Sequence, residues 1–344
     1  MGKNKKKYYD ERSRKLGKCK KKKKSRTFPL HASREAYHKI MVPSHTIYAP
    51  IVFSFQKNLD ETKGFFLNVI NHMKESVFDT KYVFDCSEVK EVTADAVMYL
   101  LALIRNERTS KKRNYFFSGI YPSDKEARKI FLESGFTKFV RSNSRPIAVN
   151  NEKFQIVQGT RNSPSDAGKI CKFVNEKFHT SNVYTHDLYS VIIELMSNVY
   201  YHAYNNDDVM VQNWYLYAEY QQNEIQIVFL DTGTGIPKTV KKNNFFEKIN
   251  AKLSKDNGLL KDYKLISSSL NGEFRTQTMK ENHGKGLPCV KEFVTSEKCK
   301  SFFVFSGKGC CKLNKEKQIK GYDSQNNLFG TIYTLTLKKM EELK

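Results

Sequence analysis

The stretch IQIVFLDTGTGIP occupies residues 225–237 and joins an apolar run to a glycine-rich turn. The run predicts a buried strand that ends at Asp231. Gly233 and Gly235 follow and suit a tight turn that lets the backbone approach a ligand closely. An ionised Asp231 only accepts hydrogen bonds, so it can accept from the exocyclic amine of adenine, whereas guanine has a carbonyl oxygen there. A glycine-rich turn is common by itself, so its neighbours decide its meaning.

A helix predicted over residues 186–204 precedes this stretch and carries polar residues beside an apolar stripe. Apolar residues recur along it at the i, i+3, i+4, i+7 spacing that is typical of a buried helix face. Glu194, Asn198 and His202 follow one another at four-residue intervals, so they share one side of the helix at the border of that stripe. Taken alone, this pattern favours a solvated helix edge over a site. The stripe consists of Leu188, Val191, Ile192, Leu195, Met196 and Val199.

Two further pieces lie downstream. In HGKGLPCV, residues 283–290, Gly284 and Gly286 precede a predicted helix, so free backbone N–H groups can face phosphates. Lys285 stands between the two glycines and adds a positive charge. In FGTIYTLTL, Thr331 begins the final predicted strand. Each piece is weak evidence by itself, and their order along the chain gives them meaning together.

In this order, the four pieces resemble the nucleotide-binding core of the GHKL ATPase superfamily. The resemblance covers residues 155–340 and is closest to the anti-sigma-factor serine kinases and to histidine kinases with a similar helix motif. It implies a Bergerat α/β sandwich with a mixed sheet, which binds ATP and Mg2+. Residues 238–283 would form the lid over the nucleotide.

The resemblance also implies a role for each matching residue. Asn198 would offer its side-chain oxygen to Mg2+, which uses few protein ligands when phosphates and waters complete its shell. Glu194, one turn earlier, would be the general base. His202 is better interpreted as a packed histidine than as a catalytic one. The residues that would bind the nucleotide are Asn198, Asp231, Gly233, Gly235, Ile236, Gly284, Lys285, Gly286, Leu287 and Thr331.

The N-terminal part predicts a second α/β domain. Strands and helices alternate in it, which is typical of α/β layers. The piece FDCSEVKEVTADAVMYLLALI, residues 84–104, resembles a STAS domain, the fold of anti-sigma-factor antagonists, and we assign that domain to residues 27–145. Those antagonists carry a phosphorylatable serine where this chain has Ala94 beside Thr93. A docking or dimerising module is therefore expected, joined by a linker near residues 141–155.

The charge of +23 is unevenly distributed. Residues 1–26 hold fourteen Lys or Arg against two acidic residues, which predicts a disordered basic arm. Such an arm attracts nucleic acid or another polyanion, or it serves only as a solubilising tail. Seven scattered cysteines without a CxxC pair match neither a zinc site nor a disulfide framework and indicate a cytoplasmic protein. No apolar run is long enough to predict a membrane span.

Two functions remain open at this stage. The first is an ATPase or a serine/threonine-kinase-like regulator in a signalling or stress pathway, which the presence of Glu194 favours. The second is an ATP-gated interaction switch without turnover, which Ala94 and the absence of any clue to a substrate favour. A regulatory protein partner is expected, and both functions are compatible with a homodimer. A histidine kinase is disfavoured, because the upstream segment predicts α/β structure rather than a helical hairpin.

Overall fold

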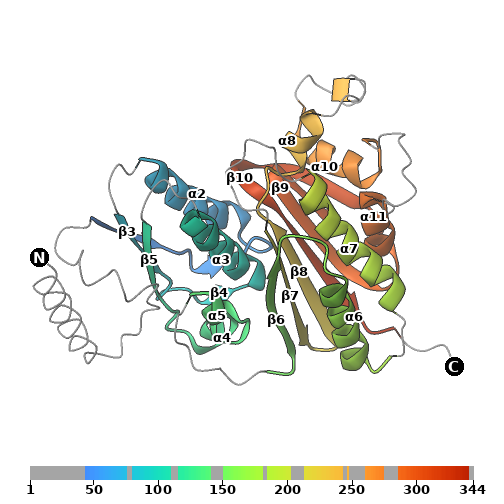
Figure 1. The fold of residues 1–344 in the computed structure, drawn as a ribbon, viewed down its shortest axis with the longest axis horizontal. Coiled ribbons are helices and arrows are strands. Elements are labelled where there is room, and N and C mark those ends of the chain that lie inside the picture. The colour runs from blue at the N-terminus through green and yellow to red at the C-terminus, as the bar shows by residue number, and fades with distance from the viewer. Residues whose placement is uncertain are drawn as a thin grey trace, which may run out of the picture.

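The computed structural model describes a mixed α/β protein with several sheets (Figure 1). The described residues are 43–75, 80–109, 115–140, 150–180, 184–202, 213–242, 246–247, 260–274 and 286–340. The predicted basic arm, residues 1–26, lies outside them, as does most of the predicted linker. Within the described ranges, no helix combines the length and the apolar character that a membrane span requires.

The N-terminal unit, residues 43–140, has the predicted alternation of strands and helices. Strands β1, β3 and β5 form a parallel sheet, and β2 pairs with β4 in a second, small parallel sheet. The stretch 125–140 forms two helices that are separated near Gly135, which has a positive φ of 90°. The elements are β1 (Ser44–Tyr48), β2 (Val52–Phe53), α2 (Leu59–Glu75), β3 (Thr80–Asp85), β4 (Glu91–Val92), α3 (Ala94–Thr109), β5 (Tyr115–Ile120), α4 (Lys125–Glu133) and α5 (Phe136–Val140).

The C-terminal unit, residues 150–340, contains a five-stranded sheet in the order β6-β7-β8-β10-β9. Helices α6, α7 and α11 cover one of its faces (Figure 1). Short helices α8 and α10 lie near the end of the sheet where β8 terminates. The elements are β6 (Lys153–Gly159), α6 (Pro164–Phe178), α7 (Thr185–His202), β7 (Trp214–Gln221), β8 (Glu224–Asp231), α8 (Ile236–Lys241), α10 (Asp262–Leu270), α11 (Leu287–Thr295), β9 (Cys299–Leu313) and β10 (Ile319–Lys338).

The prediction of a mixed sheet in this unit is wrong. All four strand pairings between the described strands of the sheet are antiparallel. The reason lies in the connections. Two helices, α6 and α7, stand between β6 and β7, so the chain reverses three times and returns antiparallel, whereas a single crossover helix would mean two reversals and a parallel return. The β7–β8 and β9–β10 pairs are hairpins and are antiparallel by construction.

The sequence also missed one strand and predicted two others too short. Strand β6 begins at Lys153, inside the stretch expected to be a linker. Apolar runs predict only short strands over residues 301–305 and 331–337, whereas strands β9 and β10 are much longer. Their extra residues include many Gly, Lys and Asn residues, so they lack the apolar pattern that indicates a strand. Pairing with each other, rather than local propensity, makes them strands.

The N-terminal unit packs on the sheet face opposite α6, α7 and α11 (Figure 1). A single buried cluster joins the two units and includes Phe55 and Tyr99 from one side with Tyr215 and Phe305 from the other. The rings of Phe55 and Phe305 lie 4.7 Å apart. The two units therefore share one hydrophobic core, so the predicted docking module is seated on the sheet of its own chain.

Two buried lysines tie the units together at opposite edges of the sheet. At the β6 edge, Lys153 forms ion pairs with Glu133 of α4, at 3.3 Å, and with Glu219 of β7, at 3.2 Å. At the β9–β10 edge, Lys63 of α2 is fully buried. Its Nζ donates to three oxygens of the hairpin: Gly307 O at 3.0 Å, Ser324 Oγ at 2.7 Å and Asn326 O at 3.2 Å.

Candidate functional site

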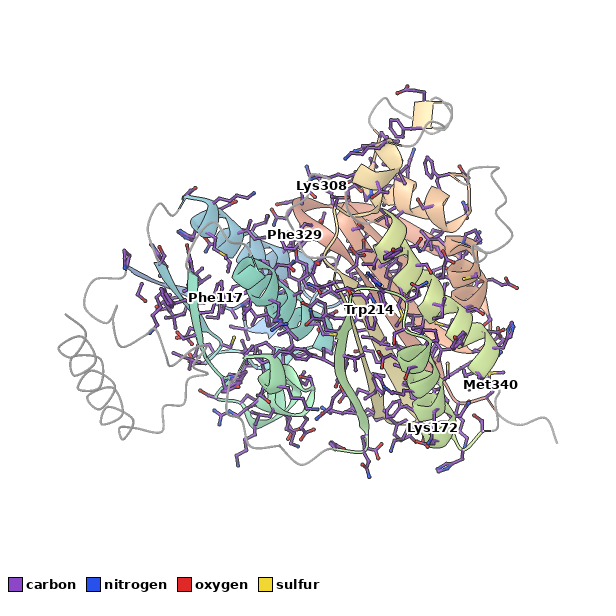
Figure 2. The ribbon with its side chains drawn as sticks, in the orientation of Figure 1. Phe117, Lys172, Trp214, Lys308, Phe329 and Met340 are labelled. Atoms are coloured by element: carbon purple, nitrogen blue, oxygen red, sulfur yellow. The ribbon has the colours of Figure 1, made fainter. Side chains whose placement is uncertain are left out.

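A row of residues crosses the sheet at the end of β8. Asp231, the last residue of β8, stands opposite Trp214 of β7 and Thr331 of β10. Thr331 stands in turn opposite Ser306 of β9. Side chains alternate along a strand, so Asp231 and Thr331 point to the same face as Phe229, the face that α7 covers. Figure 2 shows Trp214 beneath α7 at this end of the sheet.

Asp231 is a buried carboxylate that accepts several hydrogen bonds. Its exposed fraction is 7%. Its Oδ1 accepts from the backbone N–H of Gly233 at 2.8 Å, and Thr331 donates to it from both side chain and backbone. Burial raises the pKa of Asp231 from 3.8 to about 6, and these donors offset part of that increase. The carboxylate is thus held in place while it keeps acceptor capacity for another donor.

The turn after Asp231 is fixed by a buried serine. Gly235 adopts φ 87°, and a Cβ there would lie 2.8 Å from Ser306 Oγ, so glycine is required for both conformation and space. Ile236 donates its backbone N–H to the same Ser306 Oγ at 2.8 Å. Thr331 Oγ1 lies 3.1 Å from that oxygen. Ser306 therefore joins the turn to the row that holds Asp231.

Helix α7 presents the predicted polar pair at the border of its buried stripe. All six residues of the stripe are buried, as predicted. Glu194 is 8% exposed, and Asn198, one turn later, is half-buried. The Nδ2 atom of Asn198 is buried and has no hydrogen-bond partner in the part of the chain that the structure describes. His202 ends the helix, and its side chain lies outside the described residues.

Tyr333 is a buried phenol that lies near both carboxylates. It lies on β10, two residues after Thr331, and is fully buried. Burial raises its pKa well above the usual value, and the negative charges of Asp231 and Glu194 raise it further. Both carboxylates therefore lie within electrostatic reach of one phenol between α7 and the sheet.

The third predicted piece is described only in part. Gly286 precedes α11, and Leu287 is the first residue of this helix and packs against the core beneath it. Helix α11 itself packs against α7. Gly284 and Lys285 lie outside the described residues, so their predicted contacts with phosphates stay predictions.

The predicted lid, residues 238–283, contains most of α8 and all of α10, and large parts of it lie outside the described residues. Helix α10 is attached to the β9–β10 hairpin. The carboxylate of Asp323 accepts from the backbone N–H groups of Asp262 and Tyr263, at 3.0 and 2.8 Å. Asp262 Oδ2 accepts from Lys308 N at 3.0 Å. The predicted lid is thus bound to the sheet at α10.

Sequence reasoning missed two residues of this arrangement. Ser306 lies in a stretch without a motif, and only the register of β9 against β10 brings it to Thr331. Tyr333 belongs to no motif, and alternation from Thr331 is the signal that could have placed it on the α7 face. Surface hollows along α6 and β6, lined by residues such as Lys172 and Lys177, lie away from these residues.

Comparison with known proteins adds no relative: no protein-family model matches this chain, and no curated protein matches it.

Proposed function

We propose that the C-terminal unit binds ATP with Mg2+ and that the protein is a GHKL-type ATPase or serine/threonine-kinase-like regulator. The proposal treats residues 155–340 as a Bergerat-type fold and the N-terminal unit as STAS-like. It is supported by one observation above all. The buried carboxylate of Asp231 lies at the end of β8 and accepts hydrogen bonds from Gly233 and Thr331. It is on the sheet face that α7 covers, and α7 carries Glu194 and Asn198.

Asp231 is suited to selecting the base. A buried acceptor without a competing water layer discriminates strongly between an amine and a carbonyl, because a mismatched ligand leaves polar groups unpaired. Adenine presents an amine to such an acceptor, and guanine presents a carbonyl oxygen. Gly233 and Gly235 keep the backbone beside Asp231 free of side chains. The proposal therefore includes selection of adenine over guanine.

Asn198 and Glu194 fit the remaining tasks. The carboxamide of Asn198 is half-buried, and its oxygen is of a type that Mg2+ accepts as a ligand, whereas the Nδ2 atom that lacks a partner among the described residues is a hydrogen-bond donor and cannot bind the metal. When bound, Mg2+ would neutralise charge on the phosphates. Glu194 is buried on the same side of α7, where a carboxylate can take a proton from an attacking water or hydroxyl group.

Two parts of the chain are candidates for binding partners, the N-terminal unit and the basic arm. The N-terminal unit would contact a regulatory protein with the surfaces that it does not use against the sheet. The basic arm lies outside the described residues, and its attraction to nucleic acid or another polyanion stays a prediction.

The test uses the purified full chain with Mg2+ and ATP that is labelled on the γ-phosphate, with and without cell extract. We expect saturable ATP binding, weaker GTP binding, and label that appears as free phosphate or on a protein. Glu194→Gln should keep ATP binding and lower turnover at least 100-fold, the usual contribution of a general base. The matched control is Asp187→Asn, which removes another carboxylate from α7 where it pairs with Lys298, and it should leave turnover unchanged.

Each outcome separates the alternatives. Binding with released phosphate indicates an ATPase, and a labelled protein indicates a kinase. Binding without either favours the ATP-gated switch. Absence of ATP binding by the folded protein would overturn the proposal, and unchanged turnover in Glu194→Gln would remove Glu194 from the role of base.

A further inference from the structure

Tyr99 of helix α3 is the point where the N-terminal unit reaches the row that holds Asp231. It is fully buried between the units, and its ring packs against Phe66, 4.6 Å away, and against Phe329, 5.5 Å away. Its hydroxyl donates to the backbone oxygen of Phe329 at 2.9 Å. This bond joins residues that are 230 positions apart in the chain. Figure 2 shows Phe329 at the boundary between the two units.

Phe329 begins a short, tightly packed connection to Asp231. The next residue, Gly330, has φ 82°, and a Cβ there would lie 2.4 Å from the backbone oxygen of Asp231. Gly330 donates its N–H to Gly233 O at 2.7 Å. Thr331 follows and donates to the carboxylate of Asp231. A shift of the Phe329 carbonyl therefore moves both a donor to Asp231 and the turn beside it.

We propose, building on the nucleotide site proposed above, that Tyr99 is a positioning residue for Asp231 and that the N-terminal unit thereby sets the affinity and selectivity for adenine. Tyr99 touches neither the base nor the carboxylate. It fixes the carbonyl of Phe329 and, through Gly330 and Thr331, the orientation of the Asp231 carboxylate. A partner that shifts α3 on the sheet changes base recognition through this same path.

The path also has an electrostatic counterpart. Burial raises the pKa of the Tyr99 phenol well above its usual range, and the charge of Asp231 adds to this effect from the other face of the sheet. The phenol consequently stays protonated and remains a donor at any pH at which the protein would be studied. Titration of the phenol therefore does not break its bond to Phe329, whereas a movement of α3 relative to β10 does.

The test compares Tyr99→Phe with Tyr217→Phe. Both substitutions remove one buried hydroxyl from the same core, but Tyr217 donates to Glu219 at 3.1 Å and lies opposite Val228, three positions from Asp231 along β8. ATP and ITP are titrated against the full chain with Mg2+, because inosine lacks the exocyclic amine that Asp231 would accept. In Tyr99→Phe we expect ATP affinity to fall about fivefold, the effect of one ordinary hydrogen bond, and ITP affinity to stay unchanged. In Tyr217→Phe the ratio of ATP to ITP affinity should equal that of the wild type.

Hydrogen exchange of the nucleotide-free protein provides an independent readout. Tyr99→Phe should accelerate exchange in residues 231–235 and 329–331, and Tyr217→Phe should not. Unchanged exchange in these segments overturns the positioning role, as does an equal loss of ATP and ITP affinity. Accelerated exchange in a protein whose wild type binds no ATP supports the positioning role and overturns the proposed function instead.

Discussion

Asp231 is a charged group that the fold buries for a purpose other than stability. The folded protein raises its pKa from 3.8 to about 6, mainly through burial. The folded state therefore holds the proton more tightly than the unfolded chain does. The destabilisation is absent below pH 3.8, grows between pH 3.8 and about 6, and is complete above that range. A difference of about two pH units corresponds to about 3 kcal/mol.

At the residue scale, we predict that Asp231→Asn stabilises the nucleotide-free protein while it weakens ATP binding. The amide keeps an oxygen for the Gly233 N–H and removes the buried charge. The free energy of unfolding should rise by about 1–3 kcal/mol at pH 8, and this gain should vanish toward pH 4. Urea unfolding at both pH values measures the effect. A loss of stability at pH 8 would contradict it.

At the element scale, the N-terminal cap of helix α10 is provided by a residue of another element. Its own N-cap residue, Lys261, provides no side-chain acceptor. Asp323 of β10 accepts from the first two N–H groups instead, so the helix begins where the hairpin places a carboxylate. A carboxylate there also interacts favourably with the helix dipole. The predicted lid is consequently anchored by a tertiary contact at this helix.

We predict that Asp323→Ala loosens α10 without loosening α7. Loss of a cap typically costs about 1–2 kcal/mol. Amide hydrogen exchange in Asp262–Leu270 should accelerate, while exchange in Thr185–His202 should stay as it is in the wild type. Asp323→Asn keeps an acceptor oxygen and serves as the matched control with a smaller effect. Equal acceleration in both helices would show that Asp323 supports the whole unit rather than α10.

At the scale of the whole molecule, the sheet has apolar side chains on both faces. The N-terminal unit covers one face, and α6, α7 and α11 cover the other. Lys63 is buried at this junction with three oxygen acceptors, and burial lowers its pKa. Its desolvated charge destabilises the fold most at low pH, and this cost is relieved as the pH rises toward 10.5, the value of an exposed lysine. The shared core and these ties make the two units one cooperative structure.

We therefore predict a single unfolding transition for the wild type and for Lys63→Met. Methionine removes the three hydrogen bonds that the Lys63 Nζ donates to the hairpin, so the midpoint should fall by an amount equivalent to about 2–3 kcal/mol. Circular dichroism reports helices of both units, and the fluorescence of Trp214, the only tryptophan, reports the C-terminal unit. The two signals should change together. Lys129→Met, which removes an exposed lysine that pairs with Glu126, should leave the midpoint unchanged. Two separate transitions in the wild type would refute the shared core.

Local patterns predicted the elements with strong periodicity. The α7 stripe, the apolar run of β8 and the alternation of the N-terminal unit all appear where expected. Strand β6 was missed, because its pairing depends on Gly159. A Cβ there would lie 2.1 Å from the ring of Trp214, so the strand can lie beside the indole only without a side chain at that position. No local rule connects two residues that are 55 positions apart.

The sequence alone determined the polar residues of the candidate site, their chain order and the glycines beside them, because these depend on residue type and short spacing. Only the tertiary structure decided that Thr331 and Ser306 stand in one row with Asp231. It also decided that Tyr99, on the other face of the sheet, donates a hydrogen bond to Phe329 beside this row. Strand register and the packing of one unit on another are set by burial between distant segments. The physical chemistry of any single segment does not contain that information.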